Sequence, residues 1–142
     1  MPRHAGTLQV NRIVCGDALA LIPTLQDRSV NLCLTSPPYA MQRRSQYGGV
    51  TETEYPTWMC RVMASLRPKV TNDGSVLLVI RSHVRDGVVS DYVLRTRLAL
   101  REDGWKEPEE LIWWKPDAPP LTGVYKISAD FGASHSWGRR CT

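Results

Sequence analysis

A serine, two prolines and a tyrosine stand together where a short apolar segment ends. Residues 35–39 read TSPPY and directly follow the apolar residues 32–34. Proline fixes φ and has no backbone N–H, so two in a row end a strand and set the direction of the neighbouring carbonyl groups. Ser36 and the Pro37 carbonyl therefore offer two hydrogen-bond acceptors in fixed directions beside an aromatic ring.

This arrangement suits chemistry on an exocyclic amine of a nucleobase. Such an amine is a poor nucleophile, because its lone pair is delocalised into the ring. Two groups that each accept a hydrogen bond from one N–H of the amine favour a pyramidal nitrogen. They also stabilise the positive charge that develops as the nitrogen attacks. Ser36 Oγ and the Pro37 carbonyl can be those acceptors, and Pro38 stiffens the turn. Tyr39 offers a flat face on which a base rotated out of the duplex can stack.

Alternating strands and helices must position this motif. The patterns predict strands at 9–15, 30–35, 75–80 and 110–115, with a turn at 72–74 before the third. They predict helices over 18–25, from Thr51 or Thr53 to Pro68, and from Ser90 to about Glu102. This order predicts parallel βαβ units in an open α/β sheet, which binds ligands at the carboxyl ends of its strands. Residues 16–17, 36–39 and 81–83 all fall at such ends.

Composition sets the broad class. The 142 residues suffice for one domain, and 42% hydrophobic residues indicate a globular chain. The net charge of +4 permits a phosphate-bearing partner. The cysteines are far apart without a C-x-x-C pair, so we expect reduced thiols and no metal site. We also expect a cytoplasmic protein, because residues 1–5 lack a signal peptide's apolar segment and no apolar run approaches a membrane span.

The TSPPY motif strongly resembles the catalytic motif of the amino-methylating DNA methyltransferases. The similarity covers residues 13–120 and continues through the segments IVCGDALALIPTLQDRSVNLC, EYPTWMCRVMASLRPKVTNDGSVLLVI and DGVVSDYVLRTRLALREDGWKEPEELIWWK. It resembles the group in which the catalytic motif precedes the cofactor motif. The resemblance implies a partial Rossmann-like methyltransferase sheet, mostly parallel, with about four strands and flanking helices. That partial catalytic domain would span residues 1–127, followed by an irregular, disordered tail at 128–142.

The resemblance implies a reaction. S-adenosylmethionine would give its methyl group to cytosine N4 in DNA by direct in-line displacement, as in restriction–modification systems. Ser36 and Pro37 would hold and polarise the amine, Pro38 would fix the turn, and Tyr39 would stack the base. The choice of cytosine N4 rests on Ser36 alone, since adenine-N6 members more often carry Asp or Asn there. Adenine N6 is therefore the alternative acceptor.

Further residues have both a functional and an ordinary interpretation. Asp17 and Thr35 would contact the cofactor, although Asp17 also suits a helix N-cap. The resemblance also implies that three residues of the following loop contact DNA, the alternative being a solvated loop: Arg43, Arg44 and Tyr47. His83 can line the site, but an incidental loop histidine is the stronger expectation. For Trp113 and Trp114 we expect packing.

One family feature is missing. We find no glycine-rich turn resembling F-x-G-x-G, which approaches the methionine end of the cofactor. In the family, the strands around that turn lie between the strands here predicted at 9–15 and 30–35, so strand 9–15 would lack a neighbour. Three situations fit: an enzyme completed by another chain, a truncated gene product, or a smaller sheet. We expect truncation. The competing function is a non-catalytic remnant or DNA-binding fragment.

Overall fold

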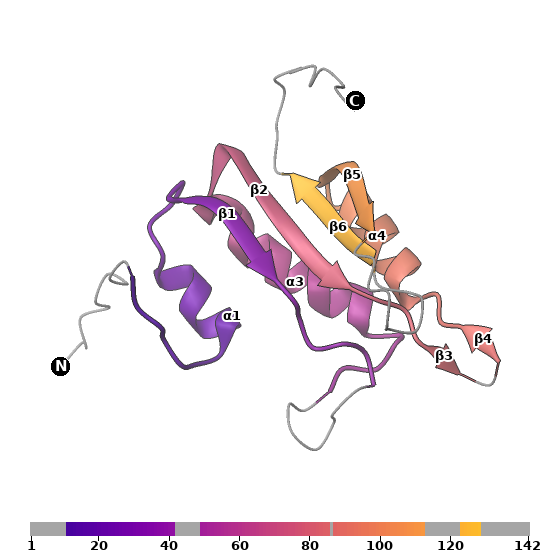
Figure 1. The fold of residues 1–142 in the computed structure, drawn as a ribbon. Helices are drawn as coiled ribbons and strands as arrows, with labels where there is room; N and C mark the ends of the chain where they lie inside the picture. Colours follow the sequence, from indigo (N-terminus) through magenta and orange to yellow (C-terminus); the bar gives the residue numbers. More distant parts are fainter. Residues whose placement is uncertain (1–10, 42–48, 86, 113–122, 129–142) are drawn as a thin grey trace.

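The protein is described by a computed structural model over residues 11–41, 49–85, 87–112 and 123–128 (Figure 1). Its elements, in chain order, are α1 (Ala18–Leu21), η1 (Ile22–Thr24), β1 (Val30–Thr35), α3 (Tyr55–Leu66), η2 (Arg67–Lys69), β2 (Val70–Ile80), β3 (Val84–Arg85), β4 (Val88–Val89), α4 (Tyr92–Glu102), β5 (Lys106–Ile112) and β6 (Gly123–Ser128). The bounds of β1 are those predicted from the sequence.

The main sheet has four strands in the order β1-β2-β6-β5. Strands β1 and β2 are parallel, while β6 is antiparallel to both β2 and β5. The predicted α/β class with about four strands is confirmed. The sheet is mixed, because β5 and β6 follow each other with no helix between them in the described residues. The expectation of a mostly parallel sheet is therefore wrong for the described strands, since β1 and β2 are parallel but the other two pairs of this sheet are antiparallel.

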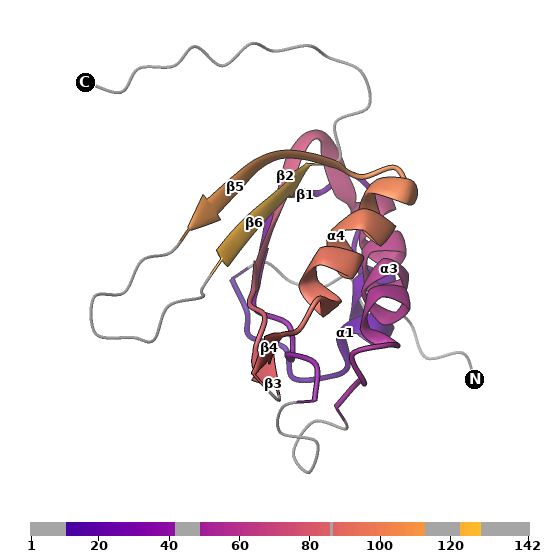
Figure 2. The ribbon, with the colours of Figure 1, turned by 90° about the vertical axis from the view of Figure 1, so that its right-hand side faces the viewer.

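Helices α3 and α4 cover one face of the sheet (Figure 2). The apolar residues of α3 recur at helical spacing, so one side of the helix is buried on the sheet. In β2 every second side chain from Val76 to Ile80 points to these helices, as the period of a strand requires. The buried core contains Tyr55, Met59, Met63 and Leu66 of α3, Val76, Leu78 and Ile80 of β2, and Tyr92, Val93 and Leu100 of α4.

The opposite face and the outer edge of β1 are open in the described part of the chain. Leu32 and Leu34 are 57% and 66% exposed. The strand predicted at 9–15 is wrong where it can be seen: residues 12–15 join no sheet, and Ile13 is fully exposed. An extended segment becomes a strand only when a neighbour accepts its backbone hydrogen bonds, and these residues have no such neighbour in the described ranges.

Further elements of the sheets differ from the prediction. The turn predicted at 72–74 lies inside β2, where the register passes from Val30 opposite Val70 to Leu32 opposite Ser75. Residues 72–74 are therefore extra residues of β2 relative to β1, at an irregularity of the kind seen in β-bulges. Strand β5 begins at Lys106, before the predicted 110, and residues 113–115 lie outside the described residues, as do Trp113 and Trp114. The hairpin β3–β4 and strand β6 were not predicted.

Candidate active site

The TSPPY motif lies at the carboxyl end of β1, as predicted. Ser36 and Pro38 are exposed, while Pro37 and Tyr39 are half-buried. Ser36 Oγ lies 3.4 Å from Tyr39 Oη, within reach of a long hydrogen bond. The hydroxyl acceptor and the aromatic ring are therefore neighbours on an accessible surface.

A cluster of buried aromatic rings supports this turn. Tyr39 packs against the core, next to the fully buried Ala40. The rings of Tyr55 and Tyr92 meet edge to face with their centroids 4.9 Å apart. Burial raises the pKa of both Tyr55 and Tyr92, and the nearby Tyr39 hydroxyl raises the pKa of each further. Both buried hydroxyls are therefore protonated at neutral pH.

The loop after the motif is closed at its base. Met41 N–H donates to the Val50 carbonyl at 3.0 Å. Arg43, Arg44 and Tyr47, predicted to contact DNA, lie outside the described residues. Their role stays a prediction.

The carboxyl end of β2 supplies the third segment of the site. Because β1 and β2 are parallel neighbours, their ends meet at one edge of the sheet (Figure 1). His83 Nε2 lies 2.6 Å from Glu52 Oε1, and both side chains are about four-fifths buried. This contact joins the residues just after β2 to the segment that precedes α3. We expected an incidental loop histidine at position 83, but His83 makes this largely buried contact. The spacing of His83 and Glu52 along the sequence does not predict it.

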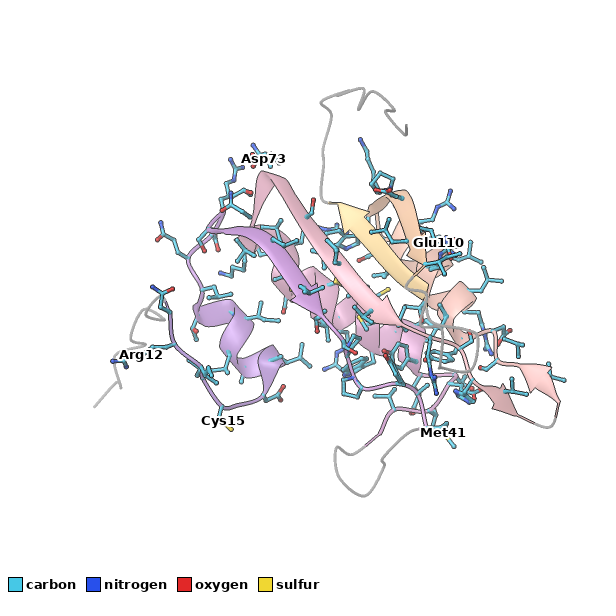
Figure 3. All side chains as sticks on the ribbon, in the orientation of Figure 1. Arg12, Cys15, Met41, Asp73 and Glu110 are labelled. Atoms are coloured by element: carbon cyan, nitrogen blue, oxygen red, sulfur yellow. The ribbon has the colours of Figure 1, made fainter. Side chains whose placement is uncertain are left out.

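Asp17 caps α1, as one of its two interpretations predicted. Its Oδ1 accepts a hydrogen bond from Leu19 N–H at 2.9 Å. Thr35 is the last residue of β1 and lies opposite Leu78 of β2. In Figure 3, Cys15, which precedes the cap, and Met41, which follows the motif, lie well apart along the lower edge of the molecule. The structure does not bring Asp17 into contact with the TSPPY turn.

The described residues give no sign of two other kinds of site. They contain no group of three or more His, Cys, Asp and Glu side chains that could hold a metal ion. Among the same residues, no helix is long and apolar enough to cross a membrane.

A family model described as DNA methylase, for N6 and N4 methyltransferases, matches residues 30–136. The chain belongs to this family. It is 31% identical over 121 residues to the type II methyltransferase M.PvuII of Proteus hauseri, covering 83% of this chain and 36% of the relative. It is also 31% identical over 138 residues to M.MwoI of Methanothermobacter wolfeii, covering 87% and 21% of the two chains. The resemblance drawn from TSPPY and its flanking segments is thereby confirmed.

Solved structures give the same fold. The PvuII DNA methyltransferase, described as cytosine-N4-specific, matches with a TM-score of 0.69 and 26% identity over 80% of this chain and 47% of that chain. The putative DNA modification methylase TTHA0409 of Thermus thermophilus, complexed with S-adenosyl-L-methionine, matches with a TM-score of 0.62 and 20% identity over 86% and 56%. The chain thus spans about a third of M.PvuII and about half of these solved chains.

Proposed function

We propose that this chain is part of a DNA methyltransferase that transfers a methyl group from S-adenosylmethionine to cytosine N4. The observation that carries the proposal is the exposed Ser36–Tyr39 turn at the open end of β1, in a chain of the DNA methylase family. The partial span relative to the relatives fits a portion of such an enzyme. We place the protein in the cytoplasm, where it would act in DNA modification.

The turn would act on the amine through two oxygens. Ser36 Oγ and the Pro37 carbonyl each accept one N–H of the target amine, and this draws the nitrogen lone pair out of the ring. Pro38 keeps the carbonyl direction fixed, so little reorganisation is needed during the reaction. Tyr39 stacks the extruded base. The protein forms no covalent bond to the base in this scheme, so no nucleophilic side chain is required.

The cofactor would lie beside the amino-terminal helix and the end of β1. The Asp17 cap uses Oδ1, which leaves Oδ2 as an acceptor for a ribose hydroxyl. Thr35 would line the same edge. When bound, S-adenosylmethionine supplies an electrophilic methyl group on its sulfonium sulfur. The glycine-rich turn that would receive the methionine end has no counterpart in this sequence, so the chain would hold the cofactor at one end.

The open edge of β1 supports a need for further strands. Leu32 and Leu34 present apolar surface, and residues 12–15 have no strand beside them in the described chain. We propose that additional polypeptide, in the form of a complementing chain with the cofactor turn, covers this edge. On its own, the chain would bind the cofactor weakly and methylate slowly or not at all.

Two measurements on the purified chain test the proposal. Equilibrium binding of S-adenosylmethionine is expected to give a dissociation constant in the millimolar range, whereas micromolar binding would contradict the incomplete site. After long incubation with duplex DNA and excess cofactor, mass spectrometry of the nucleosides is expected to find a low level of N4-methylcytosine. N6-methyladenine as the sole product would overturn the choice of cytosine. If no methylated base is found, the result would favour the competing function, a non-catalytic remnant or DNA-binding fragment.

A variant at Ser36 tests whether any methylated base is formed by the motif. Ser36→Ala is expected to lower methyl transfer by about 100-fold, the size seen when one stabilising donor or acceptor is removed from a preorganised site. Because Ser36 is exposed, the Ser36→Ala variant should unfold at the same temperature as the natural sequence. Equal transfer by Ser36→Ala and the natural sequence would remove Ser36 from the chemistry.

A further inference from the structure

Arg81 is a half-buried arginine that has no carboxylate partner in the described part of the chain. Three arginines of the described residues are half-buried: Arg67, Arg81 and Arg97. Arg67 Nη2 lies 3.6 Å from Asp103 Oδ2, and Arg97 Nε lies 2.7 Å from Glu107 Oε1. The side chain of Arg81 makes neither an ion pair nor a hydrogen bond with any described residue. Its positive charge is therefore not neutralised by these parts of the fold.

The guanidinium group of Arg81 is only partly covered. Its Nε atom is buried and has no hydrogen-bond partner within the described ranges. Its two terminal nitrogens are not among the buried, unpaired atoms, so they reach the surface. Partial burial removes water that would screen the charge, which strengthens the attraction of an anion to the open end. Two neighbouring N–H groups can bind two oxygens of one anion.

Arg81 lies at the same edge of the sheet as the TSPPY turn. Strands β1 and β2 are parallel, and Thr35 lies opposite Leu78. Ser36 directly follows Thr35, and Arg81 comes three residues after Leu78. The carbonyl of Arg81 accepts a hydrogen bond from the hydroxyl of Tyr92, a fully buried residue of α4. The backbone of Arg81 is thus anchored beside the motif, while its side chain is left unpaired.

The proposed reaction has two anionic groups that can meet this arginine: a DNA phosphate and the carboxylate of S-adenosylmethionine. The cofactor would lie beside α1 and the end of β1. Figure 1 shows α1 beyond the free edge of β1, on the side away from β2. Arg81 follows β2 and so lies on the other side of the turn. Since a base rotated out of the duplex stays attached to its sugar and phosphates, a phosphate must lie near the turn that holds the base.

We propose that Arg81 binds a backbone phosphate of the DNA strand that carries the target base, beside the TSPPY turn. This inference rests on the proposed methyltransferase function and adds a DNA-binding residue to it. The planar guanidinium group suits this role, because it pairs with two phosphate oxygens and is weakly hydrated. Phosphate contacts fix the position of a protein on DNA without reading its sequence. Arg81 would therefore hold the strand while the turn holds the base.

Binding of a fluorescein-labelled DNA duplex, measured by fluorescence anisotropy at several salt concentrations, tests the proposal in the full chain. Arg81→Gln should weaken binding about 10-fold, as loss of a charged hydrogen bond does. It should also lower the slope of log K against log salt by about 1, the loss of one phosphate contact. Arg81→Lys keeps the charge and should restore the slope, but only part of the affinity, because the paired geometry is lost.

The matched control is Arg101→Gln. Arg101 is exposed in the last turn of α4, at the other end of that helix from Tyr92. Its replacement makes the same change in net charge and should alter affinity and slope far less. An unchanged slope in Arg81→Gln, or an equal effect of Arg101→Gln, would overturn the proposal. A natural chain that binds no duplex at about 50 mM salt would also overturn it.

Two further outcomes separate this inference from its alternatives. Weaker binding of S-adenosylmethionine by Arg81→Gln, with unchanged DNA binding, would assign Arg81 to the cofactor carboxylate and overturn the proposal. Methyl transfer by the natural chain, together with equal slopes in both chains, would refute the role of Arg81 and leave the proposed function standing. A slope that depends on Arg81 without any methylated base would support the phosphate contact and count against the proposed function.

Thermal unfolding separates phosphate binding from a structural role. Arg97→Gln breaks the ion pairs with Glu107 and Glu110, so this variant should unfold at a lower temperature than the natural sequence. Arg81→Gln loses no partner among the described residues and should unfold at the natural temperature. A loss of stability as large as that of Arg97→Gln would show that Arg81 is structural and would overturn the proposal.

Discussion

The hydroxyl groups of Ser36 and Tyr39 contact each other. Their oxygens are 3.4 Å apart, which is long for a hydrogen bond between hydroxyl groups. In the proposed function, a target amine that binds Ser36 Oγ would have to share or displace this contact. Since an ordinary hydrogen bond contributes only about 1 kcal/mol net, opening this long one costs little. The geometry of the turn is therefore compatible with the proposed binding of a base.

Gly74 is a residue of β2 that has no room for a side chain. A Cβ there would lie 2.5 Å from Val70 Cγ1 and 2.9 Å from the Val30 carbonyl oxygen. Gly74→Ala should therefore destabilise the fold by about 1–3 kcal/mol, as overpacking does. Urea denaturation would measure the loss.

The control for Gly74 is Gly16→Ala. The Cβ of that variant meets only the end of the flexible Leu21 side chain, which can move aside. It should cost less than about 0.5 kcal/mol. Equal losses at Gly16 and Gly74 would contradict the steric explanation.

At the residue scale, local chemistry could be predicted and long-range contacts could not. The strand-end position of Ser36 and the cap at Asp17 follow from neighbouring residue types. The pairing of His83 with Glu52 and the reach of Tyr92 to Arg81 depend on how α4 and β2 pack. Tyr92 carries no signal in the sequence beyond that of an apolar position at a helix start.

The entry to α3 shows how a helix start is selected. The sequence is compatible with a start at Thr51 or Thr53. In the structure Thr51 Oγ1 accepts from Glu54 N–H at 3.2 Å, and its own hydroxyl donates to Glu54 Oε2 at 2.6 Å. Tyr55 N–H donates to the Thr51 carbonyl at 2.9 Å, so residues 51–54 form a turn that leads into α3. The helix itself begins at Tyr55, later than predicted.

Thr51→Ala should lower the free energy of unfolding by about 1 kcal/mol, because the cap to Glu54 is lost. Thr53→Ala is the matched control, since Thr53 is exposed and makes no side-chain hydrogen bond among the described residues. Thermal unfolding followed by circular dichroism would compare the two. A larger loss in Thr53→Ala would show that the cap is misassigned.

At the element scale, strong periodicity was a good guide and turn residues were not. Strand β1 and helices α3 and α4 follow from their apolar spacing. The residues at 72–74 favour a turn, but pairing of β2 with β1 keeps them in the strand as extra residues. Strand β6 depends on antiparallel pairing with β2 and β5, which its own short sequence does not specify.

For the molecule as a whole, the open edge and bare face of β1 predict self-association of the isolated chain. Sedimentation velocity should find species larger than the monomer as concentration rises. The double variant Leu32→Lys with Leu34→Lys should reduce them, and since both residues are more than half exposed it should remain folded.

The control for this edge is Leu98→Lys. Leu98 is 48% exposed on α4, away from β1, and its replacement should leave association unchanged. A chain of natural sequence that stays monomeric at all concentrations would contradict the prediction.

The alternation along β1 also restricts what can cover its free edge. Leu32 and Leu34 point to one side of the sheet, while Cys33 and Thr35 point to the side of the helices. A strand that pairs with this edge must have the same alternation, with apolar side chains at every second position. A shift of the pairing register by one residue would place the apolar side chains of the added strand on the opposite face of the sheet. Pairing with β1 would therefore disfavour strands in the wrong register as well as strands without this alternation.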